Sequence, residues 1–107
     1  MVKRFEIYLF NLEENTFGDA KNTRPCVIVS PDEMNEHIES IIIAPISTVS
    51  KDYPTRVSLD FLDKKRAVVL DQIRTVEKQR LAKKIGEVKG KKTRKEILGV
   101  LREMFAM

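Results

Sequence analysis

Cysteine, histidine and tryptophan are nearly absent from this sequence, which holds one cysteine, one histidine and no tryptophan. Because Cys26 stands alone, a disulfide within the chain and a metal cluster built from several cysteines are both excluded. The single His37 excludes a pair of histidines acting as acid and base within one chain. A glycine-rich phosphate loop is missing, and neither Ser30 nor Ser47 lies in a nucleophile-elbow pattern. We therefore expect no metal ion and no other cofactor.

Long hydrophobic runs are missing as well, since none approaches the length of a membrane span. The basic N-terminus, MVKRFEIYLFNLEEN, is interrupted by Glu6 and is followed by no small-residue cleavage site, which argues against a signal peptide. The chain has 107 residues, of which 42% are hydrophobic and 34% are charged. This size and composition predict one folded domain over residues 1–107, without membrane contact and located in the cytoplasm.

The charges divide unevenly along the chain. Residues 1–63 hold 6 Lys and Arg against 11 Asp and Glu, whereas residues 64–107 hold 14 against 5. The net charges of −5 and +9 give the +4 of the whole chain. Such a basic C-terminal section is typical of a surface that attracts nucleic acid or an acidic protein. A solvated, lysine-rich helix and loop would explain the same charges equally well.

Short apolar segments separated by turn signals predict strands over residues 5–11, 24–30, 40–47, 55–60 and 66–75. The first and fourth alternate apolar and polar residues, with Phe5, Ile7 and Leu9 on one face, as half-buried strands do. The others are apolar throughout, which predicts strands covered on both faces. The segments between them, including PDEMNEH and LDKK, indicate turns. Together they predict a mainly β fold, either a small barrel or a strongly bent sheet.

The period changes at the C-terminus. Thr93 followed by Glu96 forms a capping-box pattern, which predicts a helix that starts at Thr93. Apolar residues then recur at helical spacing despite Gly99, so the helix is amphipathic. Its apolar face could pack on the sheet, on a second subunit, or on both.

Polar residues occur where apolar strands begin, end or are interrupted, and these positions are the candidate functional sites. They are Arg24, Ser47, Thr48, Asp71, Gln72 and Arg74. Each has a structural alternative: an ion pair of Arg24 with a surface carboxylate, a hydrogen bond of Thr48 within its own loop, or an ion pair of Asp71 with Arg74.

Three sequence blocks, RPCVIVSPDEMN, IIIAPISTVSKDYPTRVSL and AVVLDQIRTVEKQRLAKKIGEV, resemble the signature blocks of the MazF/PemK toxin endoribonuclease family. They stand in the same order and at similar separations, and they extend over nearly the whole chain. The resemblance implies an SH3-like barrel of the MazF/PemK/CcdB type with a C-terminal α-helix. It also implies a homodimer, a cognate antitoxin partner, and metal-independent cleavage of single-stranded mRNA at a short motif.

By this resemblance, Arg24 and Thr48 are the catalytic residues. When an RNA 2′-hydroxyl attacks the adjacent phosphate, negative charge builds up, and a guanidinium offers a permanent charge and a fork of donors to it. Thr48 can orient the reacting groups through its hydroxyl. Asp71 is the candidate for a general base or, alternatively, supports the site together with Gln72.

The resemblance also predicts a set of residues that contact RNA, although the chain departs from relatives nearby. The predicted contacts are Lys21, Ser47, Lys51, Tyr53 and Arg74; packing of Tyr53 on its own barrel is an alternative. Some relatives carry an arginine where this chain has Val69, and a histidine in the first loop, which is shorter here. These departures affect the base sequence that is recognised and the contact with the antitoxin.

Two other functions compete with RNA cleavage. A toxin of the same barrel fold that poisons DNA gyrase relies on a C-terminal Trp-Gly-Ile, and this chain has no tryptophan. A non-catalytic nucleic-acid-binding barrel would need only the basic C-terminal section, and the presence of Arg24 and Thr48 argues against it.

Overall fold

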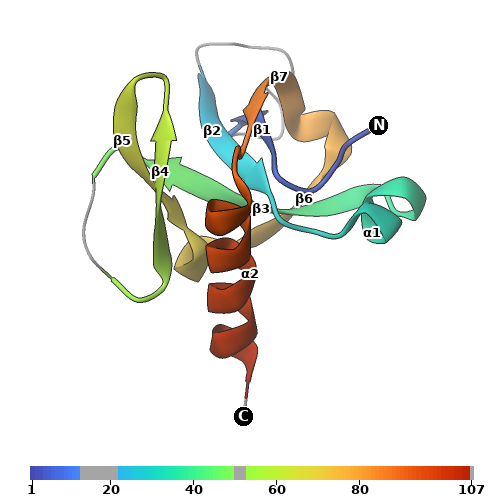
Figure 1. Cartoon of the computed structure of the whole chain (residues 1–107). Coiled ribbons are helices and arrows are strands. Elements are labelled where there is room, and N and C mark those ends of the chain that lie inside the picture. The colour runs from blue at the N-terminus through green and yellow to red at the C-terminus, as the bar shows by residue number, and fades with distance from the viewer. Residues whose placement is uncertain (13–21, 50–52, 107) are drawn as a thin grey trace.

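The computed structural model describes residues 1–12, 22–49 and 53–106 (Figure 1). No helix in these ranges is long and apolar enough to cross a membrane. Strands, α-helices and short 3-10 helices, the last written η, follow one another along the chain. They are β1 (Glu6–Asn11), β2 (Thr23–Ile28), α1 (Asp32–His37), β3 (Ser40–Ser47), β4 (Arg56–Phe61), β5 (Lys64–Val69), η2 (Leu70–Gln72), β6 (Arg74–Glu77), η3 (Lys78–Arg80), β7 (Leu81–Glu87) and α2 (Lys91–Phe105).

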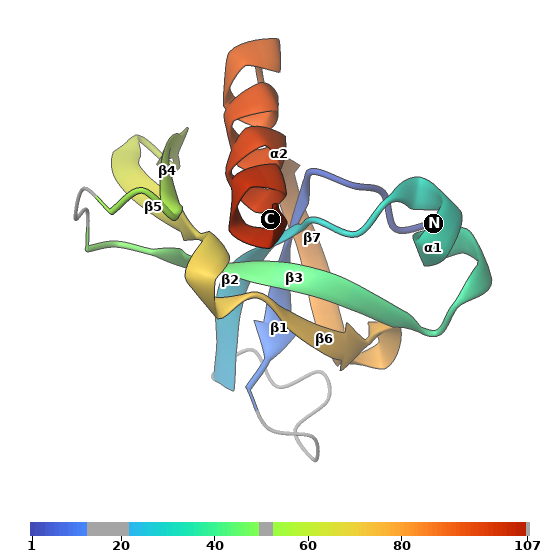
Figure 2. The same ribbon diagram turned by 90° about the horizontal axis from the view of Figure 1, so that it is seen from below.

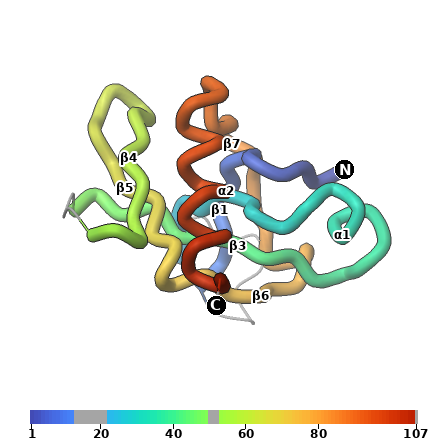
Figure 3. Tube along the Cα trace, turned by 60° about the horizontal axis from the view of Figure 1, so that its bottom comes forward, coloured from blue at the N-terminus to red at the C-terminus, as the bar shows by residue number. Residues whose placement is uncertain are grey.

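β3 is the central strand of an antiparallel sheet ordered β4-β5-β3-β2-β1-β7, with β6 also paired to β3. β2 occupies one edge of β3, while β5 and β6 share the other edge. β6 pairs with residues 40–43, whereas β5 pairs only with Ile46 and Ser47. The sheet curls as a result, and the β4–β5 hairpin stands apart from α1, with α2 between them (Figures 2 and 3). The predicted mainly β fold with a C-terminal α-helix is confirmed.

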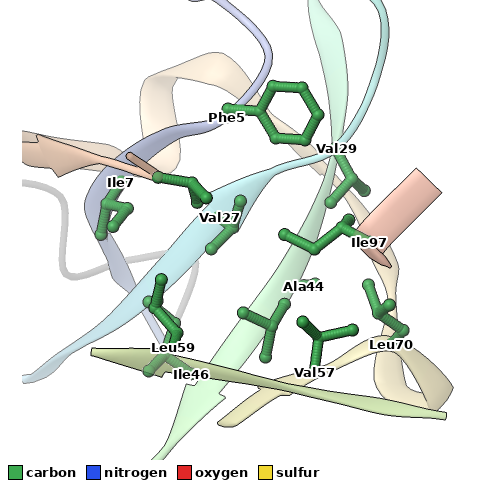
Figure 4. Close-up of a cluster of buried hydrophobic side chains, with 12 residues drawn as sticks. Phe5, Ile7, Val27, Val29, Ala44, Ile46, Val57, Leu59, Leu70 and Ile97 are labelled. Carbon is green, nitrogen blue, oxygen red and sulfur yellow. The ribbon is translucent and has the colours of Figure 1, made fainter. Parts of the chain in front are cut away.

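Alternate residues of the central strands fill two separate cores on opposite faces of the sheet. In β3, Ala44 and Ile46 belong to the first core, whereas Ile41 and Ile43 belong to the second. The first core is covered by α2, whose Ile97 is fully buried among residues of the sheet (Figure 4). This arrangement confirms that β3, an apolar strand throughout, is covered on both faces.

The β4–β5 hairpin matches its sequence pattern. Val57 and Leu59 are buried and Ser58 and Asp60 are exposed, so the predicted alternation is confirmed. The turn falls on Leu62 and Asp63, which have φ values of 53° and 59°. Positive φ at both central positions gives a turn whose twist suits the two flanking strands.

Two expectations about the elements were wrong, and one strand was not predicted. The strand expected over 66–75 is divided into β5, η2 and β6, because β3 exchanges one neighbour for the other at this point. The segment PDEMNEH forms the short helix α1, in which buried Asn35 donates a hydrogen bond to the Ser30 carbonyl at 3.0 Å. β7 was not predicted, because most of its side chains are exposed and it therefore lacks a clear apolar period.

The helix α2 begins two residues before the predicted capping box. Gly90 is its N-cap, with φ of 87°, and no side chain caps the first turn. Arg94 instead fixes this end of the helix by donating from Nε to the Val88 carbonyl at 2.8 Å. The predicted pairing of Thr93 with Glu96 is therefore wrong, because the chain turns into the helix at a glycine.

The alternation predicted for β1 holds only in part. Phe5 and Ile7 are buried, but Leu9 is half-buried and Phe10 is buried in the second core. Phe10 lies on the opposite face of β1 from Phe5 and Ile7, together with Tyr8, which packs against the second core, as alternation requires. The departure from the prediction is Leu9, which is only half-buried.

Candidate functional site

A groove of about 620 Å³ lies at the C-terminal end of β3, and residues of β1, β2, β3, β5, η2 and β6 line it. Five of the residues singled out in the sequence lie along it: Arg24, Ser47, Thr48, Gln72 and Arg74. Because Arg24 alternates in phase with Cys26, and Arg74 with Val76, both belong to the face of the second core. The groove therefore opens mainly on the face that α2 does not cover.

Arg24 enters the groove from the start of β2, opposite Phe10 of β1. Its side chain is exposed, and Nη1 donates to the Thr23 carbonyl at 2.9 Å. Pro25 follows within the strand, and its ring fixes the backbone at that point. One terminal nitrogen of Arg24 is thus tied to the backbone of its own strand, while the rest of the guanidinium stays open to a ligand.

Ser47 and Thr48 approach the groove from the end of β3. Ser47 pairs with Ala67 of β5, and its Oγ accepts a hydrogen bond from the Val49 N–H at 3.1 Å. Thr48 is exposed, and its hydroxyl makes no hydrogen bond to the residues that the structure describes. A hydrogen bond within the loop was the structural alternative for Thr48, but in the structure Ser47 makes that bond.

The charges along the groove are all of one sign. Arg24, Arg66 and Arg74 line it, and no Asp or Glu is found among its described lining residues. None of the three arginines forms a salt bridge with a residue in the described ranges. The Arg74 Cζ lies 6.0 Å from the centroid of the Phe10 ring. Like charges without counter-charges form a site suited to an anion.

Asp71 lies outside the groove. Its Oδ1 is 3.4 Å from Arg56 Nε, so the ion pair that could have joined Asp71 to Arg74 is formed with Arg56 instead. Although partial desolvation opposes the shift, the hydrogen bond and charge of Arg56 lower the pKa of Asp71 below its ordinary value. A carboxylate with a lowered pKa is a weaker proton acceptor near neutral pH.

Tyr53 also belongs to this neighbouring cluster. Its ring centroid lies 4.6 Å from Arg56 Cζ, and it does not line the groove. The tyrosine is 48% exposed. Lys21 and Lys51, the other predicted RNA contacts, lie outside the described residues.

Arg80 was not selected from the sequence, but it is buried and holds the end of β1. Its Nε and Nη2 donate to the Asn11 carbonyl at 3.1 and 2.6 Å, and Nη2 also donates to the Leu12 carbonyl at 2.6 Å. Leu12 in turn lines the groove. Arg80 therefore positions one wall of the site from η3, which is distant in sequence from β1, and no local pattern reveals this contact.

Cys26 lies next to the groove but is unsuited to nucleophilic chemistry. It is fully buried, and burial raises the pKa of its thiol to about 12. The thiol is therefore protonated at neutral pH. Among the described residues, no group of three or more His, Cys, Asp or Glu side chains could hold a metal ion.

Comparison with known proteins places the chain in a family. A model of the PemK-like, MazF-like toxins of type II toxin-antitoxin systems matches residues 3–105. The chain belongs to this family. It is 33% identical over 91 residues to the endoribonuclease MazF of Staphylococcus epidermidis, covering 79% of this chain and 76% of that protein.

Solved structures of MazF toxins share the fold. An endoribonuclease in complex with its cognate antitoxin, from a mycobacterial species, superposes with a TM-score of 0.80 at 25% identity, over 96% of this chain and 93% of that one. MazF in a MazE-MazF complex from Deinococcus radiodurans gives a TM-score of 0.79 at 20% identity, over 99% and 96% of the two chains. The SH3-like barrel expected for a MazF-like toxin is thereby confirmed.

Proposed function

We propose that this MazF-like toxin is an endoribonuclease that cleaves single-stranded mRNA at a short motif, without a metal ion, in the groove at the end of β3. The proposal rests on one observation: Arg24 from β2 and Thr48 from the end of β3 line the same groove, and no Asp or Glu is found among its described lining residues. A groove lined by three arginines, none of which forms a salt bridge with a described residue, favours the RNA backbone electrostatically.

The reaction that fits these residues is an attack of the RNA on itself. The 2′-hydroxyl releases its proton to water as its oxygen forms a bond to the adjacent phosphorus, the bond from phosphorus to the 5′-oxygen breaks, and the 5′-oxygen takes up a proton from water. The products are a 2′,3′-cyclic phosphate and a 5′-hydroxyl. Arg24 donates hydrogen bonds to the phosphate oxygens as negative charge develops on them, and Thr48 orients the attacked phosphate.

Asp71 takes a supporting role in this scheme rather than that of the base. It lies in the same 3-10 turn as Gln72, which lines the groove. Its ion pair with Arg56 ties that turn to the start of β4. Asp71 thus fixes the backbone from which Gln72 reaches the RNA. Ser47 and Arg74 contact the RNA on either side of Gln72.

The partners follow from the family. The toxin acts in the cytoplasm as a homodimer and is held inactive by a cognate antitoxin protein. The mycobacterial neighbour is an endoribonuclease in complex with its cognate antitoxin. In this chain, the three arginines that line the groove form no salt bridge within the described ranges and favour an acidic antitoxin segment. The apolar residues Val100 and Met104 line an open groove beside β4 that could receive a second subunit.

Primer extension on a long RNA, incubated with the purified protein in excess chelator, tests the reaction. We expect cuts at a short motif that chelator does not suppress, with 2′,3′-cyclic phosphate and 5′-hydroxyl ends. A matched RNA with a 2′-deoxy nucleotide on the 5′ side of the cut should resist cleavage, because the attacking hydroxyl is missing. Activity that disappears with chelator and returns with magnesium would sink the proposal.

A further inference from the structure

Arg66 is a charged residue at an inward-facing position of the β4–β5 hairpin. It pairs with Leu59 across the hairpin, and both alternate in phase with Val68. Leu59 and Val68 are buried in the first core. Arg66 is half-buried and lies where this inward row leaves the core and meets the groove.

The position of the Arg66 side chain is fixed by Phe61. Arg66 Nε donates to the Phe61 carbonyl at 3.0 Å, and Arg66 Cζ lies 5.9 Å from the centroid of the Phe61 ring. Phe61 packs against the first core and lies beside Gly86 of β7, where even a Cβ atom would come within 3.1 Å of the ring. The guanidinium is therefore anchored at Nε to a packed part of the fold.

Both terminal NH2 groups of Arg66 lack a hydrogen-bond partner within the ranges that the structure describes. A guanidinium taken partly out of water loses hydration, and without a counter-charge that loss is not offset. No carboxylate from the described chain compensates it here. This combination of an anchored Nε and open NH2 groups is what a pre-organised anion contact requires.

The strand register places Arg66 on the other side of Thr48 from Arg24. Ser47 pairs with Ala67, so one further step along the same antiparallel register brings Thr48 opposite Arg66. Cys26 pairs with Pro45, and two steps back along that register bring Arg24 opposite Ser47. The two arginines thus flank the end of β3, with backbones roughly 10 Å apart, two strand spacings.

We propose that Arg66 binds a phosphate next to the scissile one, on the side of Thr48 away from Arg24. This role rests on the proposed cleavage of RNA in the groove. A separation of two strand spacings exceeds the size of one phosphate group, so the two arginines suit successive phosphates of one strand. Arg66 fixes the strand in the groove, while Arg24 acts on the phosphate that reacts.

Salt dependence of RNA binding separates this role from a structural one. We would measure the dissociation constant for a 2′-O-methyl single-stranded RNA that spans the mapped cleavage site, over a range of salt concentrations. Arg66→Gln should weaken binding about 10-fold or more, as expected for loss of a charged hydrogen bond. It should lower the slope of log affinity against log salt by about 0.7, the value for one phosphate contact on a single strand.

Lys65→Gln is the matched control, because it removes the same charge from the neighbouring exposed residue, which does not line the groove. It should leave the slope unchanged. Arg66→Lys keeps the charge but loses the fork, so it should retain the slope with weaker binding. Thermal unfolding of each variant checks that it is folded. If Arg66→Gln does not fold, the affinity and the salt slope of Arg66→Lys are compared with those of wild type instead.

Equal slopes for wild type and Arg66→Gln, equal effects of Arg66→Gln and Lys65→Gln, or a lowered slope for Arg66→Lys would overturn the assignment. In single-turnover cleavage at saturating RNA, Arg66→Gln should stay within a few-fold of wild type, and a loss as large as that for an Arg24 variant would also overturn it. If the wild-type protein cut no RNA, the proposed function would fail. The slopes would still decide whether Arg66 contacts a phosphate.

Discussion

Glu6 is a carboxylate in a nearly buried position on β1, where it is held by Lys84, by Lys3 and, through a longer hydrogen bond of 3.4 Å to Oε1, by the Tyr8 hydroxyl. Its Oε2 lies 2.7 Å from Lys84 Nζ on β7, and its Oε1 accepts the Lys3 N–H at 2.7 Å. Burial alone would raise the pKa of Glu6, but the hydrogen bonds from Lys84 and Lys3 outweigh it, and the pKa lies below its ordinary value. Glu6 thus joins β1 to the edge strand β7 through contacts that depend on its ionisation, and therefore on pH.

The lowered pKa of Glu6 predicts a loss of stability in acid. Because the folded-state pKa lies below the unfolded one, the contribution of Glu6 is present above about pH 4 and is lost as the pH falls through the folded value. We expect the free energy of unfolding, measured in urea from pH 7 to pH 3, to fall less steeply for Glu6→Gln than for wild type. Glu39→Gln, which changes an exposed carboxylate, should keep the wild-type slope. Identical slopes for Glu6→Gln and wild type would contradict this account.

At the residue scale, the sequence indicated those site residues whose neighbours along the chain are informative. Arg24 stands before a proline and a strand, and Thr48 stands at a strand end, so both were selected and both line the groove. Arg66 was not selected, because its place beside Thr48 follows from the pairing of β3 with β5. Asp71 was selected for its position in a strand-like segment, but its partner Arg56 lies on another strand.

Two glycines bear on the helix α2, and they differ in what an alanine would meet. Gly99 lies within the helix, and an added Cβ would have nothing within 4 Å. Gly90 is the N-cap with φ of 87°, a conformation that L side chains rarely adopt. The same substitution should therefore have opposite effects at the two positions.

Gly99→Ala should raise the free energy of unfolding by about 0.5 to 1 kcal/mol, because alanine loses less backbone entropy in a helix. Gly90→Ala should lower it by about 1 to 2 kcal/mol, the cost of a left-handed backbone for a residue with a Cβ. Chemical denaturation of both variants and the wild type measures the two changes. A stability loss in Gly99→Ala would contradict the open space beside this residue.

For single helices and strands, the spacing of hydrophobic residues predicted the features that depend on local sequence. It did not predict the features that depend on which strands pair. The alternation of Val57 and Leu59 and the helical spacing around Ile97 reflect single elements, and both were predicted. The division of 66–75 was missed, because it arises where β3 exchanges β5 for β6. The helix start was placed at Thr93, since a capping-box pattern cannot reveal that Gly90 already turns the chain.

In the whole molecule, the curled sheet has its largest core on one face and the candidate site mainly on the other. α2 and the first core occupy one face of the central strands, and the groove opens mainly on the other. The residues brought to the groove come from both the acidic and the basic sections of the chain, with Arg24 from the first and Arg66 and Arg74 from the second. The overall charge division was consistent with an anionic partner or with a solvated, lysine-rich helix and loop, and only the fold shows where positive charge gathers.

In the proposed reaction, Arg24 stabilises charge that develops only in the transition state. An interaction of this kind affects the rate rather than the binding of RNA. Arg24→Lys keeps the charge but loses the planar fork that matches phosphate oxygens. Removing one pre-organised donor of this type costs about 100- to 1000-fold in rate.

The most direct test measures single-turnover cleavage and RNA affinity on the same folded preparation of Arg24→Lys. We predict a rate lowered by about 100-fold or more, with a dissociation constant within a few-fold of wild type. Lys65→Gln removes a positive charge outside the groove and serves as the control, so its cleavage rate should match that of wild type. Near-normal cleavage by Arg24→Lys, or a loss of binding as large as the loss of rate, would contradict the role assigned to Arg24.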